Sequence, residues 1–144
     1  MRAVRSQIRH LATGTTHFGY KNVPTEDKAK LVGSVFSQVA KNYDYMNDAM
    51  SCGVHRLWKN HFIDKLDPGQ RYAGKPLNYL DIAAGSGDIA LRILNHSARK
   101  YGDNESNITI SDINREMLAE GAKRFEHTRY RQGTPQGDRV TFLV

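Results

Sequence analysis

Between residues 24 and 66, apolar positions recur at intervals of three and four, which places them on one face of a helix. In the first stretch, which Pro24-Thr25 opens, the apolar positions are Val32, Val35, Phe36, Val39 and Tyr43. In the second stretch, residues 55–66, they are Leu57, Trp58, Phe62 and Leu66. Asp67-Pro68-Gly69 follows and ends the pattern, because this sequence favours a turn. The pattern predicts two amphipathic helices.

From residue 77 the pattern changes to alternating strands and helices. Residues 77–83 form a short apolar strand, a glycine-rich turn breaks it, and residues 89–101 have helical periodicity. The same alternation predicts three further elements: a strand at residues 108–113, a helix at residues 114–126 capped by Asn114, and a strand at residues 140–144. Alternating strands and helices favour parallel pairing with right-handed crossovers. The sequence therefore predicts a doubly wound, mainly parallel, Rossmann-like α/β sheet.

The predicted sheet is incomplete. Parallel sheets are usually buried on both faces, yet this sequence reaches its last residue within the third predicted strand. We therefore expect residues 17–144 to be the N-terminal part of a larger domain, truncated after the third strand. By themselves they should be poorly stable and catalytically inactive.

Positive charge is concentrated at the beginning of the chain, although the formal net charge is +6 overall. Residues 1–25 contain four basic residues and no acidic one, whereas the rest has 17 Lys and Arg against 15 Asp and Glu. The nearly neutral remainder argues against a nucleic-acid surface. A single cysteine excludes an internal disulfide, and no Cys/His cluster has the spacing of metal ligands.

Residues 1–16 combine spaced arginines with Ser and Thr, contain no acid and lack the apolar core of a secretory signal. This composition is typical of a mitochondrial presequence; the alternative is a basic tail without a targeting role. No apolar run approaches the roughly 18 residues of a membrane-spanning helix. Any membrane association is therefore expected to be peripheral.

The glycine-rich turn, residues 83–87, joins the first predicted strand of the sheet to its first helix. Glycines let the backbone bend sharply and approach a ligand, and open α/β sheets bind ligands at the carboxyl ends of their strands. Asp112 ends the second strand, where its carboxylate can accept hydrogen bonds from both hydroxyls of a ribose. A dinucleotide fits nearly as well, because Gly85, Gly87 and Ala90 satisfy a relaxed G-x-G-x-x-G/A pattern.

Asp81 favours one of these ligands. Together with Gly85 and Gly87 it resembles the first motif of class I S-adenosylmethionine (SAM)-dependent methyltransferases, in which the acid orients the ammonium group of the methionine part. Ala83 stands where that motif often has its first glycine. The alternative is an ordinary β–α turn in which Asp81 is only the polar end of a strand.

A second resemblance is more specific. The segment from Tyr43 to Trp58, YDYMNDAMSCGVHRLW, resembles the signature of the UbiE-type ubiquinone/menaquinone C-methyltransferases. That signature has Tyr-Asp-x-Met-Asn, then an apolar residue and Ser, then His and Trp at fixed spacing. The resemblance extends from about Thr16 to Val144, and together with the presequence it is closest to the mitochondrial, fungal-like branch.

The resemblance implies that SAM binds at the glycine turn and that its methyl group passes to a ring carbon of a polyprenylated methoxy-benzoquinol in coenzyme Q synthesis. By position, Ser86 corresponds to the hydroxyl residue beside SAM and Asp112 to the ribose-binding acid. Tyr43 and Asn47 lie in the segment that folds over the cofactor in such enzymes. The resemblance also implies a place in the mitochondrial matrix, peripheral on the inner membrane, in a complex with other coenzyme Q biosynthesis proteins.

No general base stands out in the sequence, and His55 and Asp44 are the first candidates to mutate. Two rival functions remain. A nicotinamide-dependent Rossmann reductase would use the same glycine turn but leaves the segment from Tyr43 to Trp58 unexplained. A non-catalytic remnant or interaction subunit of the biosynthetic complex is consistent with the incomplete sheet.

Overall fold

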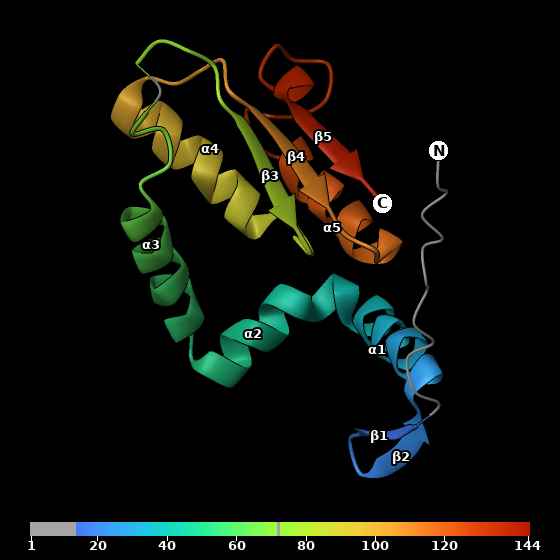
Figure 1. Cartoon of the computed structure of the whole chain (residues 1–144). Coiled ribbons are helices and arrows are strands. Elements are labelled where there is room, and N and C mark those ends of the chain that lie inside the picture. Colours follow the sequence, from blue (N-terminus) through green and yellow to red (C-terminus); the bar gives the residue numbers. More distant parts are fainter. Residues whose placement is uncertain (1–13, 72) are drawn as a thin grey trace, which may run out of the picture. The chain divides into compact units, whose positions relative to one another are not determined.

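A computed structural model describes residues 14–71 and 73–144 of the chain (Figure 1). The expected presequence falls mostly on residues 1–13, which lie outside the described residues. By its contacts the chain divides into two compact units, one extending to Val35 and the other comprising Phe36–Val144. No helix in the described part of the chain is long and apolar enough to cross a membrane.

The first unit begins with a β-hairpin that the sequence analysis did not predict. Strands β1 (Thr15–Phe18) and β2 (Lys21–Pro24) pair antiparallel. Gly19, at φ +59°, lies in the two-residue turn between them and adopts the left-handed conformation that such turns favour. Helix α1 (Thr25–Val39) follows at once, and both the backbone N–H and the hydroxyl of Thr25 donate to the Gly14 carbonyl, at 2.9 and 2.6 Å.

The second unit contains the helices that precede the sheet. They are the short 3-10 helix η1 (Ala40–Asn42), α2 (Tyr43–Ser51) and α3 (Val54–Leu66). The apolar pattern predicted one helix through Tyr43, whereas the structure ends α1 at Val39 and begins α2 at Tyr43. Helix α3 confirms the second predicted helix. It ends at Leu66 and is followed by Asp67, whose backbone is left-handed at φ +46°.

Asp67 also ties the end of α3 to α4 (Asp88–Tyr101). Its carboxylate accepts hydrogen bonds from Lys100 Nζ at 2.7 Å, Tyr101 Oη at 2.7 Å and His96 Nε2 at 2.8 Å. The hydrogen bonds from Lys100, Tyr101 and His96 hold the pKa of Asp67 well below its usual value. The turn that the sequence predicted therefore also joins two helices.

Among the residues that the structure describes, the sheet has three parallel strands in the order β3-β4-β5, which confirms the predicted α/β class. The strands are β3 (Asn78–Ile82), β4 (Asn107–Ser111) and β5 (Val140–Leu143). Helix α5 (Arg115–Glu126) lies between β4 and β5 in the chain, and the short 3-10 helix η2 (Gly137–Arg139) comes just before β5. Asn114 caps α5 as predicted, since its side-chain oxygen accepts from the Met117 N–H at 2.9 Å.

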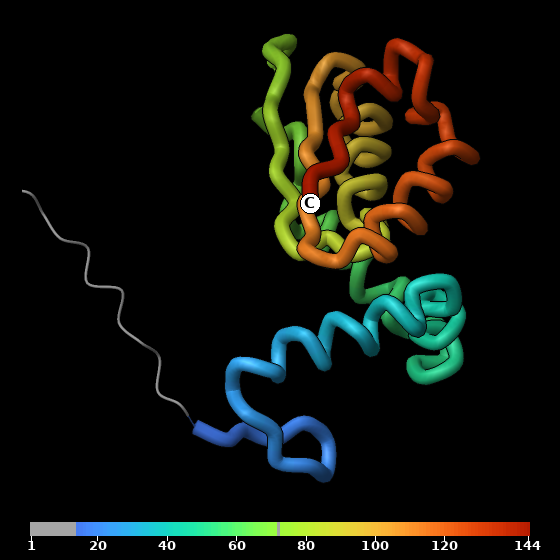
Figure 2. The backbone as a smooth tube through the Cα atoms, turned by 90° about the vertical axis from the view of Figure 1, so that its right-hand side faces the viewer, coloured from blue at the N-terminus to red at the C-terminus, as the bar shows by residue number. Residues whose placement is uncertain are grey.

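Helices α4 and α5 cover the same face of this sheet (Figure 2). The covered face contributes Ile108 and Ile110 of β4, both buried, to a core with side chains of both helices. The buried residues of this core are Ile63, Ala90, Ile93, Leu94, Ile108, Ile110, Leu118, Phe125 and Tyr130. The carboxyl ends of the strands meet at one edge, where β3 leads into the glycine turn.

Candidate functional site

In the glycine turn between β3 and α4, every second residue has a left-handed backbone conformation. Ala83, Gly85 and Gly87 have φ values of +57°, +56° and +68°. Glycine adopts this conformation freely, whereas an L-residue with a Cβ is disfavoured there by roughly 1–2 kcal/mol. Ala83, the position where the methyltransferase motif often has glycine, therefore carries backbone strain within the turn.

Helix α5 packs directly against the turn, and three glycines make this approach possible. A Cβ on Gly85 would lie 3.2 Å from Met117 Cε, and one on Gly87 would lie 3.3 Å from a ring carbon of Phe125. From the helix side, a Cβ on Gly121 would lie 3.1 Å from both the carbonyl carbon and the carbonyl oxygen of Ser86. Ser86 is 7% exposed as a result. The backbone of the turn is thus held in one place by α5.

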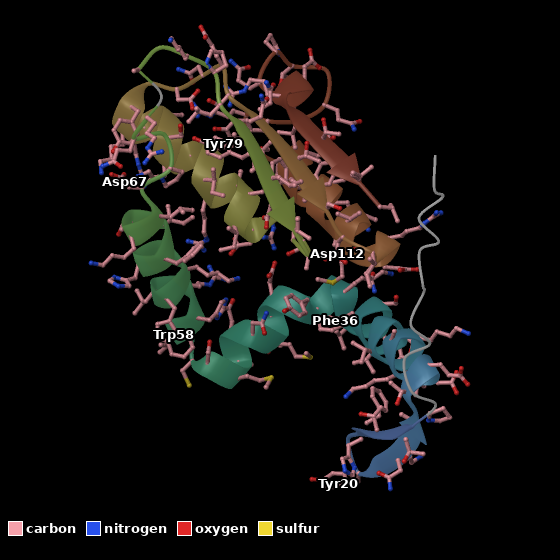
Figure 3. All side chains as sticks on the ribbon, viewed as in Figure 1. Tyr20, Phe36, Trp58, Asp67, Tyr79 and Asp112 are labelled. Carbon is pink, nitrogen blue, oxygen red and sulfur yellow. The ribbon has the colours of Figure 1, made fainter. Side chains whose placement is uncertain are left out.

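Asp112 lies at the carboxyl end of β4 and reaches the same turn (Figure 3). Its Oδ2 accepts a hydrogen bond from the Gly85 N–H at 2.7 Å, and its Oδ1 accepts one from the Asn114 N–H at 2.8 Å. The structure therefore brings together two residues that the sequence assigned to one site. A carboxylate oxygen has further lone-pair capacity after accepting one such bond, so Asp112 can still receive ligand hydroxyls.

Asp81 is the polar residue of β3 on the covered face of the sheet. Burial raises the pKa of Asp81, the Ala90 N–H opposes this in part, and the nearby charge of Asp112 raises the pKa further. Its Oδ2 is buried without a hydrogen-bond partner among the described residues. Buried polar atoms are usually paired. An unpaired carboxylate oxygen next to the turn fits a ligand that carries an ammonium group, as SAM does.

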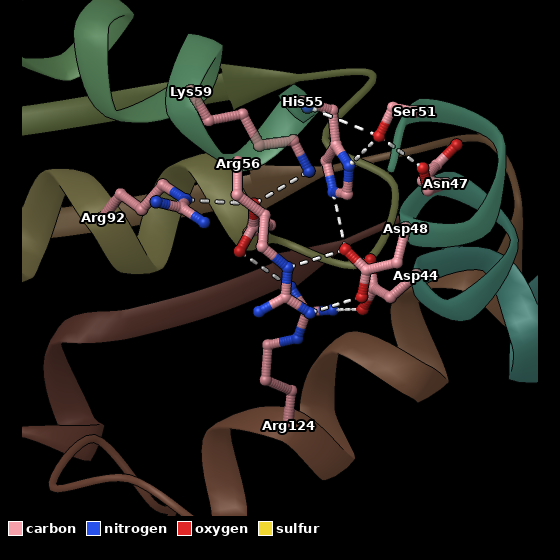
Figure 4. Close-up of polar contacts among 10 residues, drawn as sticks. Asp44, Asn47, Asp48, Ser51, His55, Arg56, Lys59, Arg92 and Arg124 are labelled. Carbon is pink, nitrogen blue, oxygen red and sulfur yellow. Dashed lines mark hydrogen bonds and ion pairs between the residues drawn. The ribbon is translucent and has the colours of Figure 1, made fainter. Parts of the chain in front are cut away.

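A group of charged side chains adjoins the turn, drawn from α2, α3, α4 and α5 (Figure 4). We call it the charged cluster; its members are Asp44, Asp48, His55, Arg56, Lys59, Asp88, Arg92 and Arg124. At its centre is Asp88, the first residue of α4, directly after Gly87. The Asp88 carboxylate pairs with Lys59 Nζ at 2.9 Å, Arg92 Nε at 3.0 Å and Arg124 Nη1 at 3.2 Å.

Burial and ion pairs shift the pKa values of two members of the cluster, Asp88 and Arg124. Burial raises the pKa of Asp88, but Lys59 and Arg92 outweigh burial and hold it below its usual value. Burial lowers the pKa of Arg124, whose guanidinium pairs with both Asp88 and Asp44. Asp44, one of the two candidate bases, is thus engaged in an ion pair with Arg124.

The other candidate base, His55, lies between α2 and α3. Its Nδ1 is 2.8 Å from Ser51 Oγ, and its Nε2 is 3.7 Å from Asp48 Oδ1. Asp48 is also bound by Arg56, whose Nε donates to Asp48 Oδ1 at 2.7 Å. These contacts orient the His55 ring within the charged cluster. A histidine with a purely structural role would make the same kind of contacts.

Two cavities adjoin the turn and the charged cluster. One, of about 280 Å³, is lined by Asp44, His55, Arg56, Lys59, Asp88, Arg92 and Arg124. The other, of about 230 Å³, is lined by Ala40, Lys41, Asp44, Ser86, Glu120, Lys123, Arg124 and His127. Ser86 and both candidate bases thus line cavities, whereas Tyr43 and Asn47 line neither of these two. The Tyr43 ring packs instead near Phe36, with centroids 6.1 Å apart.

Sequence reasoning missed Asp88, Lys59, Arg124 and Gly121. Asp88 follows the turn directly, but an acid in the first turn of a helix has an ordinary explanation in the helix dipole. Lys59 and Arg124 have no signal in the sequence, because they lie 29 and 36 residues from Asp88. Gly121 lies inside a helix, where alanine would be more favourable than glycine. This unfavourable glycine is the only sign in the sequence of the contact with Ser86. No group of His, Cys, Asp and Glu suited to a metal ion occurs within residues 14–71 and 73–144.

Comparison with known proteins assigns the chain to a family. Residues 18–143 match the sequence model of the ubiE/COQ5 methyltransferase family. Over 115 residues the chain is 52% identical to the mitochondrial 2-methoxy-6-polyprenyl-1,4-benzoquinol methylase of Schizosaccharomyces pombe. The aligned region covers 80% of this chain and 37% of that protein.

A plant relative and a bacterial relative are similar to the chain to nearly the same degree. The rice protein of the same name is 45% identical over 133 residues, 85% of this chain and 44% of that protein. The ubiquinone/menaquinone biosynthesis C-methyltransferase UbiE of Xanthomonas oryzae is 46% identical over 114 residues, 78% of this chain and 40% of that protein. The chain thus spans about two fifths of the length of these curated relatives. Since the family model matches most of its residues, the chain belongs to the ubiE/COQ5 methyltransferase family.

Proposed function

We propose that the protein containing this sequence is a SAM-dependent C-methyltransferase of coenzyme Q biosynthesis, acting on a ring carbon of a polyprenylated methoxy-benzoquinol. The observation that carries the proposal is the 52% identity to a relative named for that substrate. The rice relative carries the same name, and the bacterial relatives are named for ubiquinone or menaquinone biosynthesis. The family match, over residues 18–143, includes the glycine turn and the segment from Tyr43 to Trp58.

SAM, when bound, supplies a methyl group made electrophilic by its sulfonium. The described residues would bind and orient it. The unpaired Asp81 Oδ2 suits the ammonium group, and the Asp112 carboxylate suits the ribose hydroxyls. Ser86 belongs to the same turn and lines the neighbouring cavity of about 230 Å³. Gly85 and Gly87 let Met117 and Phe125 of α5 pack closely against the turn and so hold its backbone in place for the ligand. In this proposal Tyr43 and Asn47 of α2 cover the cofactor.

Holding the quinol carbon in line with the methyl group supplies much of the rate through proximity and orientation. A base would assist deprotonation of the quinol hydroxyl. Asp44 is paired with Arg124, so His55 is the remaining candidate within the charged cluster. The cluster itself would then chiefly fix α2 and α3 beside the turn.

A calorimetric titration tests the cofactor. In a chimera in which residues 17–144 replace the corresponding region of the S. pombe relative, we expect SAM binding that Asp112→Ala weakens about 10- to 100-fold. Charge-assisted hydrogen bonds contribute about 1.5–3 kcal/mol each, and 1.4 kcal/mol corresponds to a tenfold change. Asp138→Ala is the control, because Asp138 is exposed and lies just before the amino end of β5. The glycine turn and Asp112, in contrast, lie at the carboxyl ends of the strands.

Unchanged SAM affinity in Asp112→Ala would remove Asp112 from the cofactor site. Binding of NAD(H) without binding of SAM would favour the nicotinamide-dependent reductase. Binding of neither would favour a non-catalytic subunit of the biosynthetic complex.

We further propose that the protein works in the mitochondrial matrix, peripherally on the inner membrane and together with other coenzyme Q biosynthesis proteins. Two relatives are named mitochondrial, and a polyprenyl tail keeps a quinol in the bilayer. A fusion of residues 1–24 to a fluorescent protein should enter mitochondria, whereas Arg2/Arg5/Arg9→Glu should leave it in the cytosol. A diffuse wild-type fusion would contradict the targeting part of this proposal.

A further inference from the structure

Helix α2 is attached to the rest of the second unit by polar side chains. None of its nine residues, all of which the structure describes, is buried, and Tyr45 and Met50 are 77% and 80% exposed. Toward its end, Ser51 and Asp48 contact His55 of α3. Isolated helices shorter than roughly 12–15 residues are only marginally stable in water. The position of α2 therefore depends on side chains that reach it from other helices.

Arg124, in the last turn of α5, reaches α2 and α4 at once (Figure 4). Its Nη2 pairs with Asp44 Oδ2 near the start of α2, and its Nη1 lies 3.2 Å from Oδ1 of Asp88, which directly follows the glycine turn. We call these two ion pairs the Arg124 bridge. The Arg124 side chain is only 22% exposed, and a charge that is partly withdrawn from water needs such partners. One guanidinium thus joins the start of α2 to the turn.

The chain that leads into α2 follows α5. Ser37 Oγ accepts a hydrogen bond at 3.1 Å from Nδ2 of Asn114, the cap of α5. Ala40 is buried, and with Asp44 and Ser86 it lines the cavity of about 230 Å³. Residues 37–44 therefore extend from the beginning of α5 to its last turn and border the glycine turn between these two points. Their polar contact with the last turn is the Arg124 bridge, and loss of the bridge would free α2 there.

We propose that Arg124 is a positioning residue for SAM, which holds Asp44, and with it α2, beside the glycine turn where the cofactor binds. This inference rests on the proposed function, in which Tyr43 and Asn47 of α2 cover the cofactor. Tyr43 directly precedes Asp44, and Asn47 follows it by three residues, so both move with the start of α2. The role of the Asp44 carboxylate is then to anchor α2, and it takes no proton from the quinol.

Hydrogen exchange tests the anchor without any ligand. In the chimera described above, the α2 amides of residues 47–51 report whether this helix is docked. Arg124→Gln should accelerate their exchange about fivefold or more, because an undocked helix of this length does not persist. Arg99→Gln is the matched control, since Arg99 is an exposed arginine in the last turn of α4, away from the glycine turn. It should leave the exchange of α2 unchanged.

Calorimetric titration of the same chimera tests the effect on SAM. Asp44→Asn and Arg124→Gln should each weaken SAM binding about tenfold, as a fall of the docked form of α2 to about a tenth of the molecules would do. The double variant should lose no more than either single variant, because both remove the same contact. Arg124→Lys keeps the positive charge and should recover most of the affinity. In turnover, the loss should appear in the KM for SAM rather than in kcat.

Three results would overturn the proposal. The exchange of α2 is the same with and without Arg124→Gln, Arg124→Gln lowers stability but not SAM affinity, or the losses of affinity add up in the double variant. A fall in kcat with an altered pH profile in Asp44→Asn alone would also overturn it, and would make Asp44 the base. If the unsubstituted chimera binds no SAM, the proposed function fails, and with it the role of Arg124 toward SAM. Faster exchange in ligand-free Arg124→Gln would still establish the anchor of α2.

Discussion

Gly87 and Gly102 have almost the same backbone conformation, φ +68° and +69°, but different surroundings. An alanine Cβ at Gly102 would meet nothing within 4 Å, whereas at Gly87 it would lie 3.3 Å from Phe125 and 3.4 Å from Ile110. We expect Gly102→Ala to cost about 1–2 kcal/mol, the strain of a left-handed L-residue. Gly87→Ala should cost more, because crowding of the core adds to this strain. Urea unfolding of both variants gives the comparison.

A measurement of cofactor binding distinguishes the two substitutions further. In the chimera described above, Gly87→Ala should weaken SAM binding, because Gly87 belongs to the turn, and Gly102→Ala should leave it unchanged. Equal losses of stability in both variants would show that the packing of Phe125 against the turn is loose. Equal SAM affinity would place the ligand away from residues 83–87.

Among the helices, Asp88 is the carboxylate that links α3, α4 and α5. Its folded-state pKa lies below its usual value, so it contributes stability above the pKa of the unfolded chain, near 4. That stability is lost as the pH falls through the lower, folded value. Asp88→Asn should therefore reduce the free energy of unfolding by about 2 kcal/mol at pH 7 and flatten its decline below pH 4. Urea titrations from pH 2 to pH 7 measure both effects.

Asp138→Asn is the control for this charge removal, since Asp138 is exposed and lies outside the charged cluster. It should change neither the stability at pH 7 nor its dependence on pH by a comparable amount. If Asp88→Asn is as stable as the unsubstituted protein at pH 7, the pairs with Lys59, Arg92 and Arg124 contribute no net stability. Surface ion pairs often behave in this way.

For the whole molecule, we predict that residues 1–144 alone transfer no methyl group. The face of the sheet that α4 and α5 do not cover leaves Leu80, Ile82 and Leu143 exposed to water. The stability should therefore fall well below the roughly 5–15 kcal/mol of ordinary domains. The free strand edges also favour self-association. The test is to measure the solubility and unfolding of the chain and its transfer of labelled methyl from SAM to a quinol analogue. A soluble monomer with turnover would place the chemistry within these residues, and His55→Ala would then be the first variant to assay.

Much of the architecture was predictable because its causes are local. The short apolar stretch of residues 77–83 and the periodicity of residues 89–101 predicted β3 and α4, and the Asn114 cap predicted where α5 begins. The position of the glycine turn followed from these elements. So did the meeting of Asp112 with Gly85, because parallel strands bring their carboxyl ends to the same edge.

The remaining features depend on contacts between residues far apart in the chain. The sequence showed an apolar side for α3 but not that Trp58 and Phe62 stay exposed, because burial depends on which neighbours are present. It gave no sign that Lys59 and Arg124 would meet at Asp88, or that Gly121 would touch Ser86. Periodicity and caps act within a few residues and thus determined the elements and the turn. Only tertiary packing decided which charges pair beside that turn and which apolar surfaces remain open.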